Sequence, residues 1–137
     1  MPIMENITVL RSLDIFRAIP DPDLVKVASI LKGKEVRAGE DIIREGELGT
    51  SMFIIVEGQV RVHAQGTQIA MLGSGSVVGE LAALDPELRT ASVTALNDTF
   101  LFEVDGDALS QLMSERVDVA RGLIRVLCRR VRSALKK

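Results

Sequence analysis

The chain of 137 residues contains one cysteine, one histidine, and neither tryptophan nor tyrosine. The lone Cys128 excludes an internal disulfide and fits a protein of the reducing cytoplasm. Metal sites in small barrels usually draw several histidine or carboxylate ligands to one cavity, so His63 alone does not predict one. No serine–histidine–aspartate or cysteine–histidine pattern predicts a nucleophilic enzyme either. We therefore expect no catalytic residue, no metal site and no resident cofactor.

Long apolar runs are also missing. No stretch approaches the roughly 18 to 20 apolar residues that a membrane helix requires. The first six residues show no basic region followed by an apolar core, so we expect no secretory signal. The hydrophobic fraction of 47% and the charged fraction of 26% are typical of a soluble globular protein. We expect one domain over residues 1–137, located in the cytoplasm.

Charge is unevenly distributed along the chain. Residues 1–120 hold ten lysines and arginines against nineteen acids, a net charge of −9, whereas residues 121–137 hold seven basic residues and no acid, a net charge of +7. A basic tail can contact nucleic acid or a membrane surface. Cations also favour the C-terminal end of a helix and keep it soluble. We prefer this second interpretation, which predicts no nucleic-acid binding.

The periodicity of the sequence divides the chain into three parts. Apolar residues recur at helical spacing in residues 1–33, and a second helix is predicted from Asp21 to about Gly33. Residues 34–104 alternate short β-prone runs with glycine turns, which indicates a sandwich or barrel. Residues 105–137 are predicted to be helical again. The predicted fold is mainly β with flanking helices: a jelly-roll β-barrel, an N-terminal helical segment and two C-terminal helices.

An apolar stripe with alternating steps of four and three residues starts at Met113 in the first of the two predicted C-terminal helices and continues along the last one. Its members are Met113, Val117, Ala120, Ile124, Leu127, Val131 and Ala134. This is a heptad pattern of about three repeats. Such a stripe can pack on the barrel, form the seam of a homodimer, or close over a ligand, and three heptads do not decide between these roles.

Two short segments carry the functional signal. Residues 78–84 are Val-Gly-Glu-Leu-Ala-Ala-Leu, and residues 89–93 are Arg-Thr-Ala-Ser-Val. Gly79 opens a short helical turn, and the free amides of a helix start attract anions. Arg89 adds a planar, permanently charged fork of donors that suits a phosphate. Glu80 can accept hydrogen bonds from a sugar hydroxyl, so the segments predict a pocket for a small phosphorylated sugar.

These segments resemble the phosphate-binding cassette of the cyclic-nucleotide-binding domain family, which includes catabolite activator proteins and regulatory subunits of protein kinases. That cassette has the pattern Phe-Gly-Glu-Leu-Ala followed by Arg, a small residue and Ala, and Val78 replaces the aromatic residue here. The resemblance implies that Arg89 holds the cyclic phosphate and that Glu80 holds the ribose 2′-hydroxyl. The implied ligand-binding residues are Gly79, Glu80, Leu81, Ala82, Arg89, Thr90 and Ala91.

The resemblance also implies a function. We expect a cyclic-nucleotide-binding regulatory or sensor module whose ligand is cAMP rather than cGMP, although Thr90 occurs in relatives that respond to either nucleotide. Because the chain has no Trp or Tyr, no such ring can stack on the base, and we expect an apolar lid from the last helix. Binding would be coupled to movement of that helix about a hinge at residues 105–113.

The regulated effector is expected outside this chain, in another domain or in a partner protein. In catabolite-activator relatives the last helix connects to a DNA-binding domain of about 50 residues or more, and we expect no such domain and no DNA binding in this chain. The pattern does not distinguish a stand-alone sensor from a piece of a longer protein. The alternative interpretation keeps the fold without the ligand, as a protein-interaction or dimerisation domain.

Overall fold

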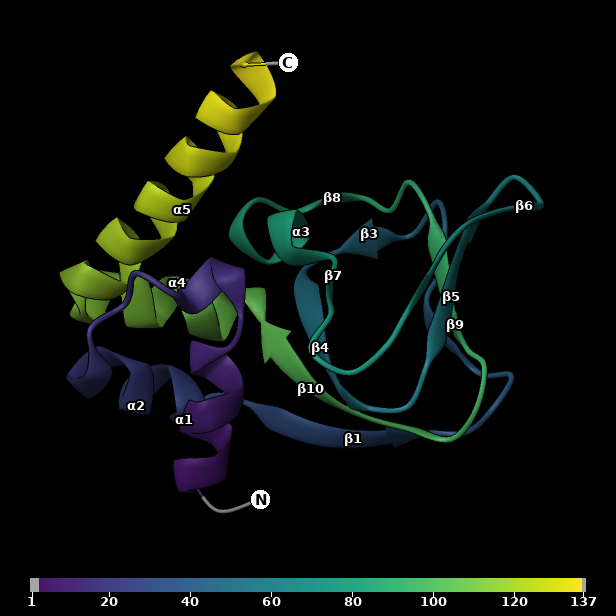
Figure 1. Cartoon of the computed structure of the whole chain (residues 1–137), viewed down its shortest axis with the longest axis horizontal. Coiled ribbons are helices and arrows are strands. Elements are labelled where there is room, and N and C mark those ends of the chain that lie inside the picture. The colour runs from purple at the N-terminus through teal and green to yellow at the C-terminus, as the bar shows by residue number, and fades with distance from the viewer. Residues whose placement is uncertain (1–2, 137) are drawn as a thin grey trace. The chain divides into compact units, whose positions relative to one another are not determined.

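The computed structural model describes residues 3–136. They belong to two units, which we describe separately. The β unit covers Leu31–Asp107, and the helical unit combines Met1–Ile30 with Ala108–Lys137. Figure 1 shows the strands of the β unit in blue to green, the N-terminal helices in purple to blue, and the C-terminal helices in green to yellow.

The β unit contains two four-stranded sheets and one two-stranded ribbon among the described residues, and every pairing in them is antiparallel. The first sheet has the order β1-β10-β4-β7, the second has the order β2-β9-β5-β6, and the ribbon pairs β3 with β8. The strands are β1 (Lys32–Val36), β2 (Asp41–Ile43), β3 (Leu48–Gly49), β4 (Ser51–Glu57), β5 (Val60–Ala64), β6 (Thr67–Leu72), β7 (Val77–Val78), β8 (Glu87–Leu88), β9 (Ser92–Ala95) and β10 (Thr99–Asp105).

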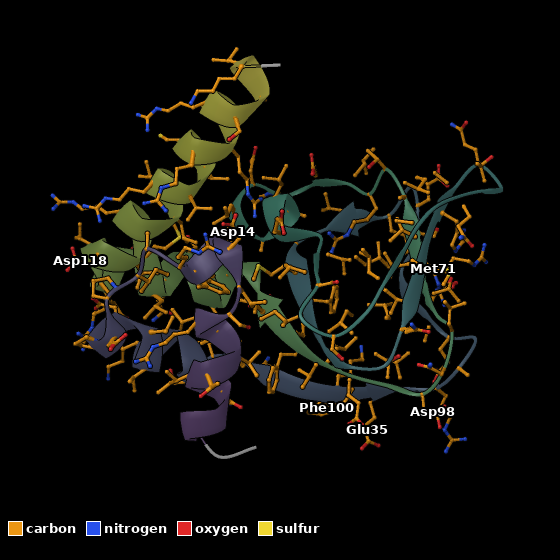
Figure 2. All side chains as sticks on the ribbon, in the orientation of Figure 1. Asp14, Glu35, Met71, Asp98, Phe100 and Asp118 are labelled. Atoms are coloured by element: carbon orange, nitrogen blue, oxygen red, sulfur yellow. The ribbon has the colours of Figure 1, made fainter. Side chains whose placement is uncertain are left out.

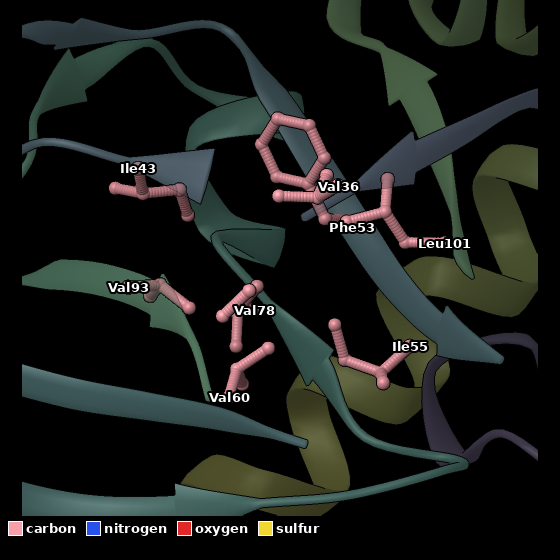
Figure 3. Close-up of a cluster of buried hydrophobic side chains, with 9 residues drawn as sticks. Val36, Ile43, Phe53, Ile55, Val60, Val78, Val93 and Leu101 are labelled. Carbon is pink, nitrogen blue, oxygen red and sulfur yellow. The ribbon is translucent and has the colours of Figure 1, made fainter. Parts of the chain in front are cut away.

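The core of the β unit lies between the inner faces of the two larger sheets. Alternate residues of a strand point to opposite faces, so one set of apolar side chains meets in the middle. Figure 3 shows this cluster, with Val60 and Val93 from the second sheet facing Val78 and Ile55 from the first. Its buried members are Val36, Ile43, Phe53, Ile55, Val60, Val78, Val93, Ala95 and Leu101.

The helical unit consists of α1 (Ile3–Arg11), the short 3-10 helix η1 (Asp14–Phe16), α2 (Asp21–Ser29), α4 and α5 (Val117–Leu135). Helix α4 spans Gly106–Glu115 and so begins in the last residues of the β unit. The apolar residues predicted at helical spacing near the N-terminus are buried, and α5 packs against η1 and α2. These helices, with the antiparallel sheets between them in the sequence, confirm the predicted fold class.

Several element boundaries differ from the prediction. Strand β1 begins at Lys32 rather than at residue 34, and β10 continues to Asp105 rather than ending at 104. Helix α2 begins at Asp21, as predicted, with Pro20 in extended conformation as its N-cap, but it ends at Ser29. The glycine that was expected to end this helix, Gly33, instead lies inside β1 opposite Phe102. Strand pairing therefore extends the β unit at both ends.

Helix α5 buries a face different from the heptad stripe. Val119, Gly122, Leu123 and Val126 are buried, whereas Val117, Ile124 and Val131 are 56%, 56% and 58% exposed. The buried set recurs at three- and four-residue spacing on one side of the helix, and Gly122 is close to the main chain of Ala18. The heptad stripe thus lies largely on the outer face of α5. None of the helices in the described part of the chain is long and apolar enough to cross a membrane.

Candidate functional site

Gly79 connects β7 to the short helix α3 (Glu80–Leu84). Its backbone has φ +73° and ψ 20°, the left-handed conformation that glycine adopts without a steric penalty. In α3, Ala82 and Ala83 are buried, and Leu81 is exposed to solvent. The sequence therefore places a glycine in left-handed conformation directly before the helix of the predicted cassette.

Arg89 lies between β8 and β9, and both of its main-chain hydrogen-bonding groups are satisfied. Its amide donates to the carbonyl oxygen of Glu47, and its carbonyl accepts from the amide of Gly46, each at 2.8 Å. These bonds continue the β3–β8 pairing by one step along the chain. The backbone of Arg89 is thus fixed to Gly46 and Glu47, which directly precede β3.

The side chain of Arg89 runs between two glycines. A Cβ atom built on Gly79 would be 2.5 Å from Arg89 Nη1, and one built on Gly49 would overlap the Nε, Cζ and Cδ atoms of Arg89. The guanidinium also donates a 2.7 Å hydrogen bond from Nη2 to the main-chain carbonyl of Ser51. Only residues without a side chain leave enough room for this path. Gly49 and Gly79 therefore position the guanidinium.

The Arg89 guanidinium is partly desolvated. Burial lowers the pKa of Arg89 below its ordinary value, and the nearby Glu87 carboxylate opposes this shift. Since arginine keeps its proton in proteins, the group remains a cation. It forms no ion pair with any residue that the structure describes. The site thus presents a fixed positive charge, and the Arg89 guanidinium uses only part of its hydrogen-bonding capacity in the bond to Ser51.

A cavity of about 300 Å³ lies beside this guanidinium. One part of its wall is polar and comes from the cassette, and the rest is mostly apolar and comes from the inner faces of β2, β5, β6, β7 and β9. The lining residues are Ile43, Val62, Ala70, Leu72, Val78, Gly79, Glu87, Arg89, Thr90, Ala91 and Val93. An apolar cavity with a few convergent polar groups has the form of a small-molecule site.

A second cavity of about 270 Å³ shares Arg89 with the first. It is lined by the β2–β4 region, including Arg44, Glu47 and Ser51. Arg89 therefore lines both cavities, and its hydrogen bond to Ser51 involves a residue of the second one. A change of rotamer would alter both cavities together.

The structure brings together four of the seven predicted ligand residues. Gly79, Arg89, Thr90 and Ala91 line the 300 Å³ cavity. Glu80, Leu81 and Ala82 do not line it: Glu80 is half-buried at the first position of α3, Leu81 is exposed, and Ala82 is buried. Val78, which replaces the usual aromatic residue, pairs with Phe53 of β4 and joins the core of the β unit.

Sequence reasoning missed Glu87 and the apolar walls of the cavity. The walls come from alternate residues of β5 and β6, such as Val62, Ala70 and Leu72, and strand alternation could have indicated them. Gly49 was also not predicted as a site residue. Its importance depends on the path of the Arg89 side chain, which no local pattern shows.

The site is connected to the start of α4 through β4. Ser51 donates a 3.0 Å hydrogen bond from Oγ to Glu103 Oε2 of β10, while its carbonyl accepts from Arg89. The amide of Gly106 donates to the carbonyl of the preceding residue, Thr50, at 2.8 Å. A Cβ atom on Gly106 would be 2.9 Å from the carbonyl oxygen of Ala83 in α3. The first residue of α4 is thus in close contact with Thr50, the residue before β4, and with the cassette helix.

The fold and the cavity define a ligand-binding β-sandwich with helices at both ends of the chain. Comparison with known proteins gives its family. Residues 33–116, more than half of the chain, match the family model described as the cyclic nucleotide-binding domain. The chain therefore belongs to the cyclic nucleotide-binding domain family.

Individual relatives support this assignment. The chain is similar to a CRP-like cAMP-activated global transcriptional regulator of Mycobacterium tuberculosis, with 27% identity over 129 residues, covering 90% of this chain and 58% of the regulator. It is also similar to the cGMP-dependent protein kinase egl-4 of Caenorhabditis elegans, with 32% identity over 108 residues, covering 79% of this chain and 14% of the kinase. The chain thus spans only part of the length of these relatives.

A solved structure matches over nearly the whole chain. It is the N-terminal domain of a transcriptional regulator from Streptomyces coelicolor A3(2), with a TM-score of 0.87 and 28% sequence identity, covering 93% of both chains. This likeness includes the N-terminal helices, the antiparallel sheets and the C-terminal helices.

Proposed function

We propose that this chain is a regulatory module that binds a cyclic nucleotide, cAMP in preference to cGMP, in the 300 Å³ cavity of the β unit. The observation that carries the proposal is Arg89, a cation without an ion-pair partner among the described residues, fixed between two glycines at the polar part of an apolar cavity. A phosphodiester carries the single negative charge that would pair with the Arg89 guanidinium, and the apolar walls of the cavity suit a purine base.

In this proposal, Arg89 binds the cyclic phosphate and Glu80 binds the ribose 2′-hydroxyl. Main-chain amides near Gly79 and Ala91 complete the phosphate contacts. Thr90 adds a hydroxyl beside the phosphate, and its exposed side chain is compatible with this role. Leu81 and Ala82 shape the cassette helix. For Glu80 to reach the ligand, α3 must move toward the cavity, because Glu80 does not line it in this structure.

The preference for cAMP rests on the apolar walls of the cavity and on one relative that matches most of this chain. Val62, Ala70 and Leu72 offer no side-chain polar group that could read the exocyclic groups of guanine. The M. tuberculosis regulator named as cAMP-activated covers 90% of this chain. Thr90 and the likeness to a cGMP-dependent kinase favour cGMP as the second candidate. Calorimetric titration of both nucleotides into ligand-free protein decides between them, and tighter binding of cGMP would overturn the preference.

We further propose that residues 1–137 act as one cytoplasmic module without catalytic activity. In the relatives the matched region is part of a longer protein, which supports an effector in another domain or on a partner. Ligand binding would move the last helix about residues 105–113. Amide exchange across residues 105–137 should change at saturating cAMP, and an unchanged exchange pattern would contradict the coupling.

A second candidate function is a dimerisation or protein-interaction domain, with or without a ligand. The exposed side chains of Val117, Ile124 and Val131 on α5 favour it, because they recur every seven residues on one face. In this case the chain forms a homodimer through α5. Light scattering should give the mass of a dimer, and Ile124→Glu should convert it to a monomer. Arg125→Glu, which alters an exposed basic neighbour, serves as the control.

A further inference from the structure

Glu87 faces the same cavity as Arg89. It lies in β8 opposite Gly49 of β3, and the pairing continues with the hydrogen bond from the Arg89 amide to the Glu47 carbonyl. Residues two apart in an extended segment point to the same side. Glu87 and Arg89 therefore both line the cavity, while the intervening Leu88 is 64% exposed.

The two charges act on each other without forming an ion pair. Glu87 makes no ion pair with any residue in the described part of the chain. Its carboxylate nonetheless acts electrostatically on the Arg89 guanidinium. A ligand phosphate bound by Arg89 therefore also experiences the negative charge of Glu87. This repulsion, which weakens phosphate binding, would be absent from a cavity that contained Arg89 without Glu87.

We propose that Glu87 is a specificity residue that makes the cavity select a singly charged phosphodiester over a doubly charged phosphomonoester. The inference rests on the proposed function, since it requires a nucleotide phosphate at Arg89. A cyclic phosphate carries one negative charge, which the positive charge of Arg89 balances. Glu87 therefore repels a single unit of ligand charge. A 5′-monophosphate carries two negative charges well above pH 6, so its repulsion energy with Glu87 is twice that of the cyclic phosphate.

The size of the effect follows from Coulomb's law. The repulsion energy between Glu87 and the ligand is proportional to the ligand charge. Because affinity depends exponentially on energy, the factor by which Glu87 weakens the binding of a dianion is the square of the factor for a monoanion. A factor of about three for the monoanion is reasonable for partly exposed charges, which gives about ten for the dianion. Removing the charge at residue 87 should therefore strengthen the binding of both ligands, and that of the monophosphate more.

The test compares wild type with Glu87→Gln at pH 8. Affinities for cAMP, 5′-AMP and the 5′-methyl ester of AMP are measured by competition against a fluorescent cAMP analogue. The methyl ester is acyclic like AMP but carries one charge like cAMP, so it separates charge from ring shape. We expect Glu87→Gln to increase affinity about tenfold for AMP and about threefold for cAMP and the ester.

The matched control is Glu35→Gln. This variant removes the same charge from an exposed residue of β1, which Figure 2 shows at the edge of the β unit away from β8 and α3. It should leave the ratio of AMP to cAMP affinity unchanged. Thermal unfolding of both variants should match wild type, because both side chains are exposed.

The possible results separate the inference from the proposed function. If wild type binds neither cAMP nor cGMP, the proposed function fails and the inference fails with it. If wild type binds cAMP but AMP competes no better with Glu87→Gln, the inference alone is overturned. An equal gain for AMP and its methyl ester also overturns it, because the effect would then not depend on charge.

Discussion

The guanidinium of Arg89 donates a 2.7 Å hydrogen bond to the main-chain carbonyl of Ser51 on the neighbouring strand β4. Because the acceptor is a main-chain carbonyl, no side-chain substitution at residue 51 can remove it. The bond uses one arm of the fork and leaves the other nitrogens available to a ligand. It also links the guanidinium that is proposed to bind the phosphate to Ser51 of β4. The side chain of Ser51 in turn contacts β10 through its hydrogen bond to Glu103.

Replacement of Arg89 by alanine should abolish most of the affinity for cyclic nucleotide. Hydrogen bonds to charged groups contribute roughly 1.5–3 kcal/mol each, and a fork forms two of them, so we expect a loss of about 100-fold or more. Arg89→Lys keeps the charge but not the fork and should retain an intermediate affinity. Calorimetry measures both. Arg37→Ala, an exposed arginine of the same unit, is the control, and undiminished affinity in folded Arg89→Ala would refute the site.

Three glycine-to-alanine variants separate backbone strain from steric conflict with Arg89. Gly75→Ala introduces strain alone, since φ is +87° and nothing lies within 4 Å of the new Cβ atom. Gly49→Ala introduces conflict alone, and Gly79→Ala introduces both. We expect strain to cost about 1 kcal/mol of unfolding free energy in Gly75→Ala and Gly79→Ala. Only Gly49→Ala and Gly79→Ala should also weaken cyclic-nucleotide binding.

Chemical denaturation and calorimetry measure these two effects independently. Normal binding by Gly79→Ala would mean that the Arg89 side chain can bind the ligand along a different path. Weakened binding by Gly75→Ala would mean that strain in the β unit, rather than contact with Arg89, controls the site. Either outcome would contradict the positioning role of the two glycines.

The sequence predicted most of the architecture because the relevant signals are local. Glycine turns, strand-length β-prone runs and apolar residues at helical spacing each act over a few residues, and together they indicated the sheets and the flanking helices. The buried face of α5 could not be predicted. A heptad count identifies which residues share a face, but Val119, Leu123 and Val126 form a competing face, and only the neighbouring helices determine which one is buried.

The site was predictable only in part, for a related reason. Gly79, Arg89, Thr90 and Ala91 belong to one short segment pattern, and they line the cavity. The contribution of Gly49 depends on pairing between β3 and β8 and on the rotamer of an arginine 40 residues further along the chain. Glu87 lies inside the cassette but has no counterpart in the motif, so its place in the cavity became visible only in three dimensions.

Enlarging Val78 to phenylalanine tests what the missing aromatic residue changes. Val78 is 7% exposed, lies in the core of the β unit, and also lines the cavity. A larger side chain in a filled core should reduce the free energy of unfolding by about 1–3 kcal/mol. It should also reduce the cavity and weaken binding. Val78→Ile, a smaller enlargement, is the control, and increased stability of Val78→Phe would show that the core has unfilled space.

Gly106 provides the last test, because α4 begins there in close contact with the cassette helix and with Thr50, the residue before β4. A Cβ atom there would overlap the Thr50 carbonyl oxygen and be 2.9 Å from that of Ala83, and neither main-chain atom can rotate away. Gly106→Ala should therefore lower the free energy of unfolding by about 1–3 kcal/mol. Gly73→Ala is the control, since its nearest neighbour would be 3.8 Å away.

The binding data on the same variant then address coupling. If α3 and the start of α4 must move together, Gly106→Ala should alter both the affinity for cyclic nucleotide and the ligand-dependent amide exchange of residues 105–137. A variant that loses stability but keeps both properties would show that Gly106 serves packing alone. In that case, signal transfer would have to follow the hydrogen bond from Ser51 to Glu103, and Ser51→Ala should weaken the exchange response while the main-chain bond to Arg89 persists.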